Sequence, residues 1–253
     1  MGDELLPALA VATCLGAGIL SILMGLASNY PLAMASGMGL NAFLAYGMVI
    51  GMKIPWQTAM GVVFLEGIII TILVLTNVRE QVMNAIPLDL KRGIGVGIGL
   101  LSALVGLQNA GLVVADPATL IAFGKLGHEN LVAIFGLAAT TILFVKKIRG
   151  SFLIGILLST AAAAALGLVH MPAALVAGVK PEYFRTFFAL DIAGAMRLGL
   201  MGTLFAFLIT DFFDTMGTVV AVGEQAGFMD KAGKMPRLKN ILFVDSLGAV
   251  SGG

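Results

Sequence analysis

The stretch NYPLAMASGMGLNAFLAY, residues 29–46, interrupts what would otherwise be a run of apolar helix. It contains Pro31, Gly37 and Gly39, and it places the polar Asn41 in the first turn of the helix that follows. In hydrocarbon, every backbone N–H and C=O needs a partner within the protein. A broken backbone is therefore tolerated only where it is buried in protein or lines a cavity. The stretch predicts a solute site inside a membrane domain.

Composition supports a membrane protein. The chain has 253 residues, of which 59% are hydrophobic and only 11% are charged, whereas a soluble domain carries roughly 25% charged residues. The apolar residues form long runs separated by short charged clusters, as in polytopic proteins of the lipid bilayer. A net charge of +1 gives no basic surface for nucleic acid. Cys14 lies in an apolar run, and neither His128 nor His170 has a metal-ligand neighbour, so we expect no metal site.

The apolar runs predict seven spans of roughly 20 residues each and the start of an eighth. These spans are residues 6–27, the broken segment 31–50, 56–75, 93–114, 130–145, 152–170 and 198–222, with the eighth starting in 238–253. The predicted fold class is an all-α polytopic membrane protein. The eighth run is too short to cross a bilayer.

Loop charges predict the orientation. Ten basic residues fall in alternate loops on one side and five on the other, so the first side is cytoplasmic by the positive-inside rule. The first set is Arg79, Lys91, Arg92, Lys146, Lys147, Arg149, Lys231, Lys234, Arg237 and Lys239, and the second is Lys53, Lys125, Lys180, Arg185 and Arg197. The N-terminus then lies outside. A missing preceding span explains this, and together with the short eighth run it predicts a chain truncated at both ends.

Two connections and one glycine motif carry further predictions. Residues 77–91 (NVREQVMNAIPLDLK) have apolar side chains among charged ones, which predicts an amphipathic helix on the cytoplasmic face, ended by Pro87. The longest connection, 171–197, is expected to be an extracellular loop. GIGVGIG, residues 93–99, favours helix packing over a dinucleotide loop because no βαβ pattern surrounds it.

Carboxylates inside apolar spans are costly and are therefore candidates for function. Asp211 and Asp214 lie in LFAFLITDFFDTMGTVV, share a helix face at a spacing of i, i+3, and are followed on that face by Thr218. Three readings are open for the pair: solute binding with proton uptake, a structural role, or an aspartyl protease dyad. The absence of a GxGD turn disfavours the protease. Glu66, in VVFLEGIII, is either a packing partner or part of transport.

Asn41 also has two readings. Gly37 and Gly39 start a half-helix whose free N–H groups face a cavity in the functional reading. In the other reading, the Asn41 side chain satisfies only local N–H groups. Residues 31–35 (PLAMA) are predicted to be a short extended piece that leads into the half-helix.

These motifs resemble a known family. NYPLAMASGMGLNAFLAYGMV is similar to the third-span signature of the hypoxanthine/guanine/adenine permeases, a branch of the xanthine/uracil permease superfamily. WQTAMGVVFLEGIIITIL, VREQVMNAIPLDLKRGIGVGIGL and VGLQNAGLVV resemble the stretch that follows it. DFFDTMGTVVAVGEQAGFMDKAGKMPRLKNILFVDSLGAVSGG resembles the eighth span, its cytoplasmic loop and the start of the ninth. The matches run in order over nearly the whole chain.

The resemblance implies a fold of two inverted seven-helix repeats, each divided between a core and a gate domain. By this mapping, residues 1–75 are core spans two to four and 76–92 are the linker helix. Residues 93–170 are gate spans five to seven, 171–197 the extracellular loop, and 198–253 core span eight with an incomplete ninth. The substrate in the family lies between the third and tenth spans, and the partner strand of the tenth span is not in this chain. We therefore expect an unpaired strand and an open half-site.

The resemblance also implies site residues. Asn41 matches the third-span Asn, and the eighth-span carboxylate matches Asp214, with Asp211 as the alternative register. Gly39 and Thr218 complete the expected substrate site, and Asp214, Asp211 and Glu66 are the candidates for proton coupling.

The expected function is import of hypoxanthine, guanine and adenine by proton symport across the inner or plasma membrane. The full-length protein would form a homodimer, with no cofactor and the proton gradient as energy source. The alternatives are a transporter of the same fold for xanthine, uracil or an anion, and an inactive truncated fragment.

Overall fold

Helices make up almost all of the secondary structure in this computed structural model, which describes residues 2–169, 180–184, 186–230 and 234–252. Five helices of the described residues are long and apolar enough to cross a bilayer. The predicted fold class, an all-α polytopic membrane protein, is confirmed. The finer prediction of a partial seven-plus-seven inverted repeat stays a prediction.

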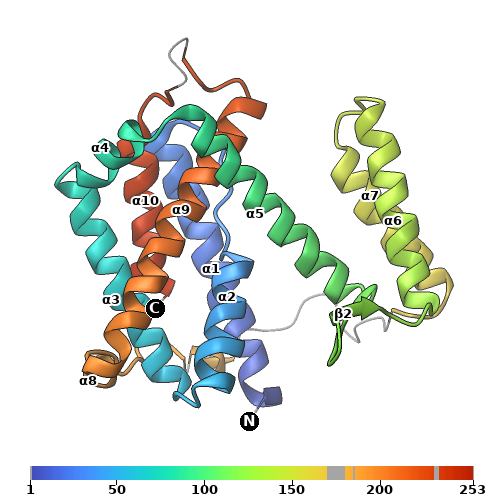
Figure 1. The fold of residues 1–253 in the computed structure, drawn as a ribbon, viewed down its shortest axis with the longest axis horizontal. Coiled ribbons are helices and arrows are strands. Elements are labelled where there is room, and N and C mark those ends of the chain that lie inside the picture. The colour runs from blue at the N-terminus through green and yellow to red at the C-terminus, as the bar shows by residue number, and fades with distance from the viewer. Residues whose placement is uncertain (1, 170–179, 185, 231–233, 253) are drawn as a thin grey trace. The chain divides into compact units, whose positions relative to one another are not determined.

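The elements follow in chain order (Figure 1). They are α1 (Gly2–Ser28), α2 (Met38–Ala42), the π-helix η1 (Phe43–Gly51), α3 (Trp56–Leu75), α4 (Val78–Ala85), α5 (Leu88–Asn109), β1 (Val113–Asp116), β2 (Leu120–Phe123), α6 (His128–Val145), α7 (Ser151–Ala165), η2 (Pro181–Phe184), α8 (Ile192–Ala195), η3 (Leu198–Leu200), α9 (Met201–Gln225) and α10 (Leu238–Gly252).

The chain divides into two compact units. The first comprises Met1–Gly99 and Val179–Gly253, and the second comprises Leu100–Gly178. Helix α5 runs through the boundary between them. The assignment of core and gate roles to these parts of the chain stays a prediction.

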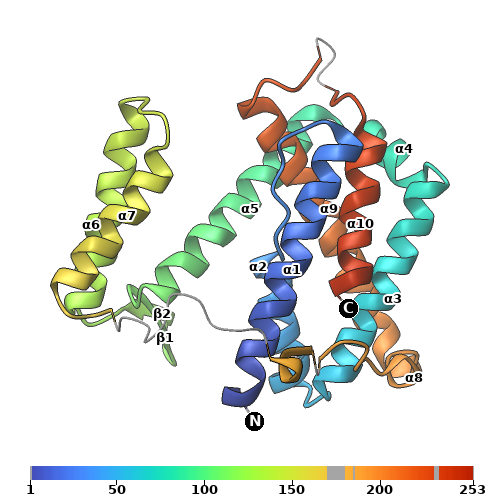
Figure 2. The ribbon, with the colours of Figure 1, turned by 180° about the vertical axis from the view of Figure 1, so that it is seen from behind.

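Helix α3 is central to the first unit, where it packs against α10, α9, α8 and α4. Helix α1 packs along α10, as both ribbon views show (Figures 1 and 2). The start of α10 also caps the end of α1, because the Asn240 side chain donates a hydrogen bond of 2.7 Å to the carbonyl of Ala27. Arg237 donates one of 3.3 Å to the carbonyl of Ser28. Carbonyls at the end of a helix lack partners within it, so this contact satisfies two of them.

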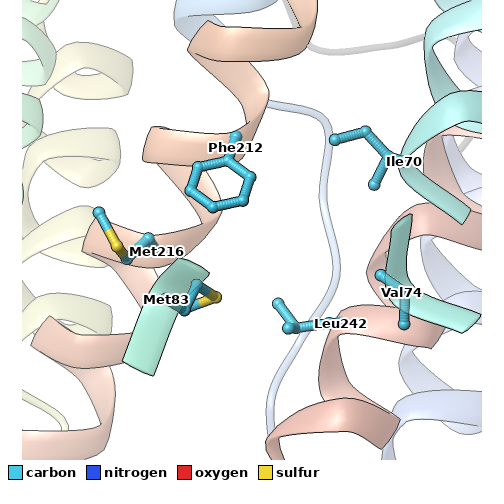
Figure 3. Close-up of a cluster of buried hydrophobic side chains, with 6 residues drawn as sticks. All are labelled: Ile70, Val74, Met83, Phe212, Met216 and Leu242. Atoms are coloured by element: carbon cyan, nitrogen blue, oxygen red, sulfur yellow. The ribbon is translucent and has the colours of Figure 1, made fainter. Parts of the chain in front are cut away.

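A buried apolar cluster joins α3, α4, α9 and α10 (Figure 3). Its members are Ile70, Val74, Met83, Phe212, Met216 and Leu242. Because lipid tails are as apolar as these side chains, close packing rather than removal from water favours such contacts in a membrane. The cluster holds α4 against the bundle through Met83.

Two glycines allow α3 to approach its neighbours closely. A Cβ on Gly67 would lie 2.6 Å from the backbone N of Val250 in α10. A Cβ on Gly61 would lie 2.5 Å from the carbonyl oxygen of Asp191, just before α8. The Asp191 side chain then accepts hydrogen bonds of 2.9 Å from the Gly194 N–H and from the Thr58 hydroxyl. These two bonds hold the pKa of Asp191 below its usual range, and the bond from Gly194 has the larger effect.

The predicted span 93–114, whose helix α5 enters the second unit at Leu100, is wrong at both ends, since α5 begins at Leu88 and ends at Asn109. Gly111, with φ of 66°, turns the chain out of the helix into the antiparallel hairpin of β1 and β2. Asn130 closes this turn, because its side chain donates a hydrogen bond of 2.7 Å to the carbonyl of Ala110. The hairpin was not predicted, because a short run of apolar, β-branched residues is equally compatible with a strand and with the end of an apolar helix.

Small residues bring α6 and α7 together in the same unit. A Cβ on Gly136 would collide with the Ser159 side chain, and one on Gly155 would collide with Thr140. Helix α7 ends at Ala165, earlier than the predicted span 152–170. His170 and residues 171–179 of the predicted extracellular loop lie outside the described residues, and so do Arg185 and Lys231.

Candidate functional site

The break predicted within residues 29–46 is present. Helix α1 ends at Ser28, Asn29 adopts a φ of 60°, and the chain is extended until α2 begins. Leu32 and Met34 both pack into a buried cluster around Met24. Side chains two residues apart on one face are what an extended backbone requires.

The extended segment is held by a side chain and not by a sheet. The backbone N–H of Met34 donates a 2.8 Å hydrogen bond to the hydroxyl oxygen of Ser21 in α1. The only sheet in the described part of the chain is the hairpin of β1 and β2. The segment therefore runs without a strand partner among the described residues, as the sequence predicts.

Gly37 brings this backbone close to Asp214 of α9. A Cβ on Gly37 would lie 3.4 Å from Oδ2 of Asp214, which is an ordinary van der Waals distance. Gly37 has φ of −68° and ψ of 119°, so its backbone is not strained. Its lack of a side chain leaves open the space in front of the Asp214 carboxylate. We call Gly37, Gly39, Asn41, Asp214 and Thr218 the half-site.

The other members of the half-site are exposed in the structure. Asn41 donates a hydrogen bond of 3.0 Å from Nδ2 to the hydroxyl oxygen of Ser36. This bond ties the segment before α2 to α2 itself. It satisfies no backbone N–H, so the local and the binding readings of Asn41 both stay predictions. Gly39 and Thr218 are also exposed, and Thr218 lies one turn after Asp214.

The helix that follows the half-site is not a regular α-helix. From Phe43 to Gly51 it is a π-helix, and the N–H of Met52 bonds to the carbonyl of Gly47 at 3.0 Å. Wide turns of this kind are rare and occur frequently at functional sites. The predicted half-helix is therefore present, with a wider winding than the sequence pattern indicates.

Asp211 and Asp214 contact different parts of the protein. Asp214 faces Gly37, whereas Oδ2 of Asp211 lies 3.4 Å from Nη2 of Arg79 in α4. The two carboxylates lie three positions apart on α9 but have different neighbours, and the functional readings of the pair stay predictions. The contacts of each carboxylate therefore depend on which segment packs beside it, α4 for Asp211 and the segment before α2 for Asp214.

Arg79 is the centre of a buried polar cluster. Its side chain is fully buried, and Nη2 lies 3.2 Å from Oδ2 of Asp245 in α10. Oδ2 of Asp245 also accepts a hydrogen bond of 2.8 Å from the hydroxyl of Thr215. The guanidinium lies against the ring of Phe212, 5.8 Å from its centre.

Glu66 of α3 belongs to the same cluster. It is 1% exposed, and its Oε1 has no hydrogen-bond partner in the structure. It interacts electrostatically with Asp211, Arg79 and Asp245. Asp245 also interacts electrostatically with Asp214. Asp245 therefore interacts with carboxylates of both the cluster and the half-site. We call Glu66, Arg79, Asp211, Thr215 and Asp245 the Arg79 cluster.

Sequence reasoning missed three members of this cluster, Arg79, Thr215 and Asp245. Asp245 interrupts the apolar run of α10, so the rule that selected Glu66 would have found it. Arg79 was counted as a loop charge because it stands in a charged stretch. In this segment Val78 and Val82 are exposed, while Arg79 and Met83 are buried, and its placement on the cytoplasmic membrane face stays a prediction.

Comparisons with known proteins agree with the resemblance found in the motifs. The model of the xanthine/uracil permeases, described as Permease family, matches residues 1–253. The chain is 40% identical over 246 residues to an adenine permease of Escherichia coli, covering 97% of this chain and 55% of that protein. It is 42% identical over 249 residues to a guanine/hypoxanthine permease of Bacillus subtilis, covering 97% and 56%. The chain thus spans about half the length of the curated relatives it matches.

Proposed function

Because this chain belongs to the Permease family of xanthine/uracil permeases, we propose that it serves the import of purine nucleobases by proton symport. The family is one of transporters and not of enzymes. Relatives named as adenine and guanine/hypoxanthine permeases support hypoxanthine, guanine and adenine as the substrates. The observation that carries the proposal is the Asp214 carboxylate in front of the bare backbone at Gly37.

The half-site suits a flat heterocycle. A purine carries ring N–H donors on its edge, and the Asp214 carboxylate accepts such hydrogen bonds as a charge-assisted pair. The missing side chain at Gly37 lets the ring approach the backbone, and the exposed Asn41 amide orients it by donating and accepting hydrogen bonds. Gly39 and Thr218 line the same space in this proposal.

The proposed energy source is the proton gradient. Asp214, Asp211 and Glu66 are the carboxylates proposed to couple transport to protons, since each is placed in an apolar helix where its charge is costly. No cofactor takes part in this scheme. We place the protein in the inner or plasma membrane as a homodimer in its full-length form.

Substitution of Asp214 tests the function. The Asp214→Asn variant of the complete gene product should lose at least nine-tenths of radiolabelled hypoxanthine uptake, because the neutral amide no longer offers two acceptor oxygens. Glu129→Gln, at an exposed carboxylate in the first turn of α6, should transport normally. Uptake by Asp214→Asn at the wild-type rate would remove this residue from the mechanism.

Competition assays test the choice of substrate. Excess unlabelled adenine, guanine and hypoxanthine should each reduce the uptake of labelled hypoxanthine. Xanthine, uracil and inorganic anions should not. If the wild-type protein binds uracil or an anion instead of purines, the proposed purine substrate is wrong and the alternative substrate takes its place.

A further inference from the structure

We propose that the Arg79 cluster is the proton-binding site of this protein and that Glu66 is the residue that takes up the proton. The site lies inside the helical bundle and is separate from the half-site at Gly37 and Asp214. This inference rests on the proposed function and adds to it by separating the proton from the nucleobase.

The charges of the Arg79 cluster do not balance. Three carboxylates interact with one guanidinium in the cluster, so the fully ionised form carries two uncompensated negative charges. The cost of a buried, unpaired ion is several kcal/mol, and a carboxylate avoids it by binding a proton. The cluster therefore favours occupancy by a proton.

Glu66 differs from the other two carboxylates of the cluster in its contacts. Asp211 and Asp245 each face the Arg79 guanidinium, at 3.4 Å and 3.2 Å. Glu66 is the most buried carboxylate of the cluster, and its Oε1 lacks a partner. A proton on this carboxylate removes the charge that has the poorest compensation.

The surroundings of Glu66 favour a proton over a metal ion. The charged groups that face it are Asp211 from α9, Arg79 from α4 and Asp245 from α10. Asp191, just before α8, accepts a hydrogen bond from Thr58 near the start of α3. In the part of the chain that the structure describes, no three His, Cys, Asp or Glu side chains are arranged to hold a metal ion.

Arg79 gives the site two arrangements. Its Nε and Nη1 are buried without partners, as is Oε1 of Glu66, so donor and acceptor groups of complementary charge are both free. When Glu66 releases its proton to solvent, the guanidinium gains a third carboxylate as partner and weakens its long contact to Asp211. Arg79 lies on α4, which directly precedes α5 in the chain.

Proteoliposomes that contain the complete gene product and an internal pH-sensitive dye test the proposal. Two activities are compared: exchange of labelled for unlabelled hypoxanthine, which needs no net proton movement, and accumulation driven by a pH gradient. Glu66→Gln should lose accumulation and nucleobase-dependent acidification at least tenfold while exchange remains measurable. Asp214→Asn should lose both activities, and Glu129→Gln should lose neither.

The outcomes separate the two proposals. Wild-type protein without exchange would overturn the proposed function and the proton site with it. Glu66→Gln protein that accumulates hypoxanthine and acidifies the lumen like wild type would overturn the proton site alone. Accumulation driven by a sodium gradient at constant pH would also overturn it.

A measurement on wild-type protein covers the case in which Glu66→Gln does not fold. Infrared difference spectra, recorded as the pH is lowered, should show the C=O band of a protonated carboxyl in apolar surroundings. Glu66→Asp, which keeps the carboxyl, should shift this band and retain pH-driven accumulation at a reduced rate. A spectrum without such a band, or a band unaffected by Glu66→Asp, would contradict the proposal.

Discussion

At the scale of single residues, neighbours decide what a carboxylate does. Asp211 and Asp214 lie three positions apart on α9, yet one contacts the Arg79 guanidinium and the other faces the backbone of Gly37. The i, i+3 spacing turns the two side chains by 60° about the helix axis. That angle is enough for α4 and α10 to surround the first and for α2 to approach the second.

Arg79 provides a prediction at this scale. Arg79→Met should lower the free energy of unfolding by about 3–5 kcal/mol, because removing one partner leaves buried carboxylates without a compensating charge. The matched control is Arg92→Met. Arg92 pairs with Glu224 at 2.8 Å but its side chain is 53% exposed, so its loss should cost about 0–1 kcal/mol. Thermal melting of the detergent-solubilised proteins measures the difference. Equal melting temperatures would show that the buried pair adds no stability.

At the scale of elements, the close contact between α3 and α10 depends on a missing side chain. Gly67 faces the backbone at Ala249 and Val250 of α10, and backbone atoms cannot turn away as a flexible side chain can. Glu66 precedes Gly67 in the sequence, and Asp245 lies on α10. The two helices in this contact therefore carry two of the four charged members of the Arg79 cluster.

Gly67→Ala tests this contact. A Cβ at 2.6 Å from the N of Val250 forces the helices apart, which should cost about 1–3 kcal/mol of stability. Gly97→Ala is the control, since a Cβ there meets nothing within 4 Å and alanine favours a helix by up to about 1 kcal/mol over glycine. Melting curves should therefore move in opposite directions. A neutral Gly67→Ala would mean that α3 and α10 are less tightly held than the structure indicates.

The elements were unequally predictable. Residues 56–75 were predicted as a span with the same bounds that α3 has, because Pro55 and a polar turn delimit an uninterrupted apolar run. The end of α5 and the hairpin after it were missed, because their residues are as apolar as a helix and only Gly111 marks the change. A short apolar segment does not distinguish a strand from the last turn of a span.

At the scale of the whole molecule, the loop charges predict which ends of the helices meet the cytoplasm. In the second unit, Lys147 lies in the turn between α6 and α7, and Lys125 lies between β2 and α6. These two positions sit at opposite ends of α6, so the positive-inside rule places them on opposite sides of the membrane.

Cysteine labelling tests this orientation. In a Cys14→Ser background of the complete gene product, Lys147→Cys should react with a membrane-impermeant maleimide only after the cytoplasmic side is exposed. Lys125→Cys should react in intact cells, because its loop is predicted to face outward. The reverse pattern would invert the topology and place the start of the half-site segment on the outer side.

The sequence by itself determined that this is a membrane protein, where most of its helices run and where its backbone is broken. Hydrocarbon imposes these features locally, since each segment must satisfy its own N–H and C=O groups or be interrupted. Only the tertiary structure decided that Asp214 faces Gly37, that Arg79 points inward, and that Glu66, Asp211 and Asp245 surround it. The Arg79 cluster joins α3 and α4 to α9 and α10, two pairs of helices that are far apart in the chain. The partners of these groups depend on how the helices pack, which no local sequence pattern records.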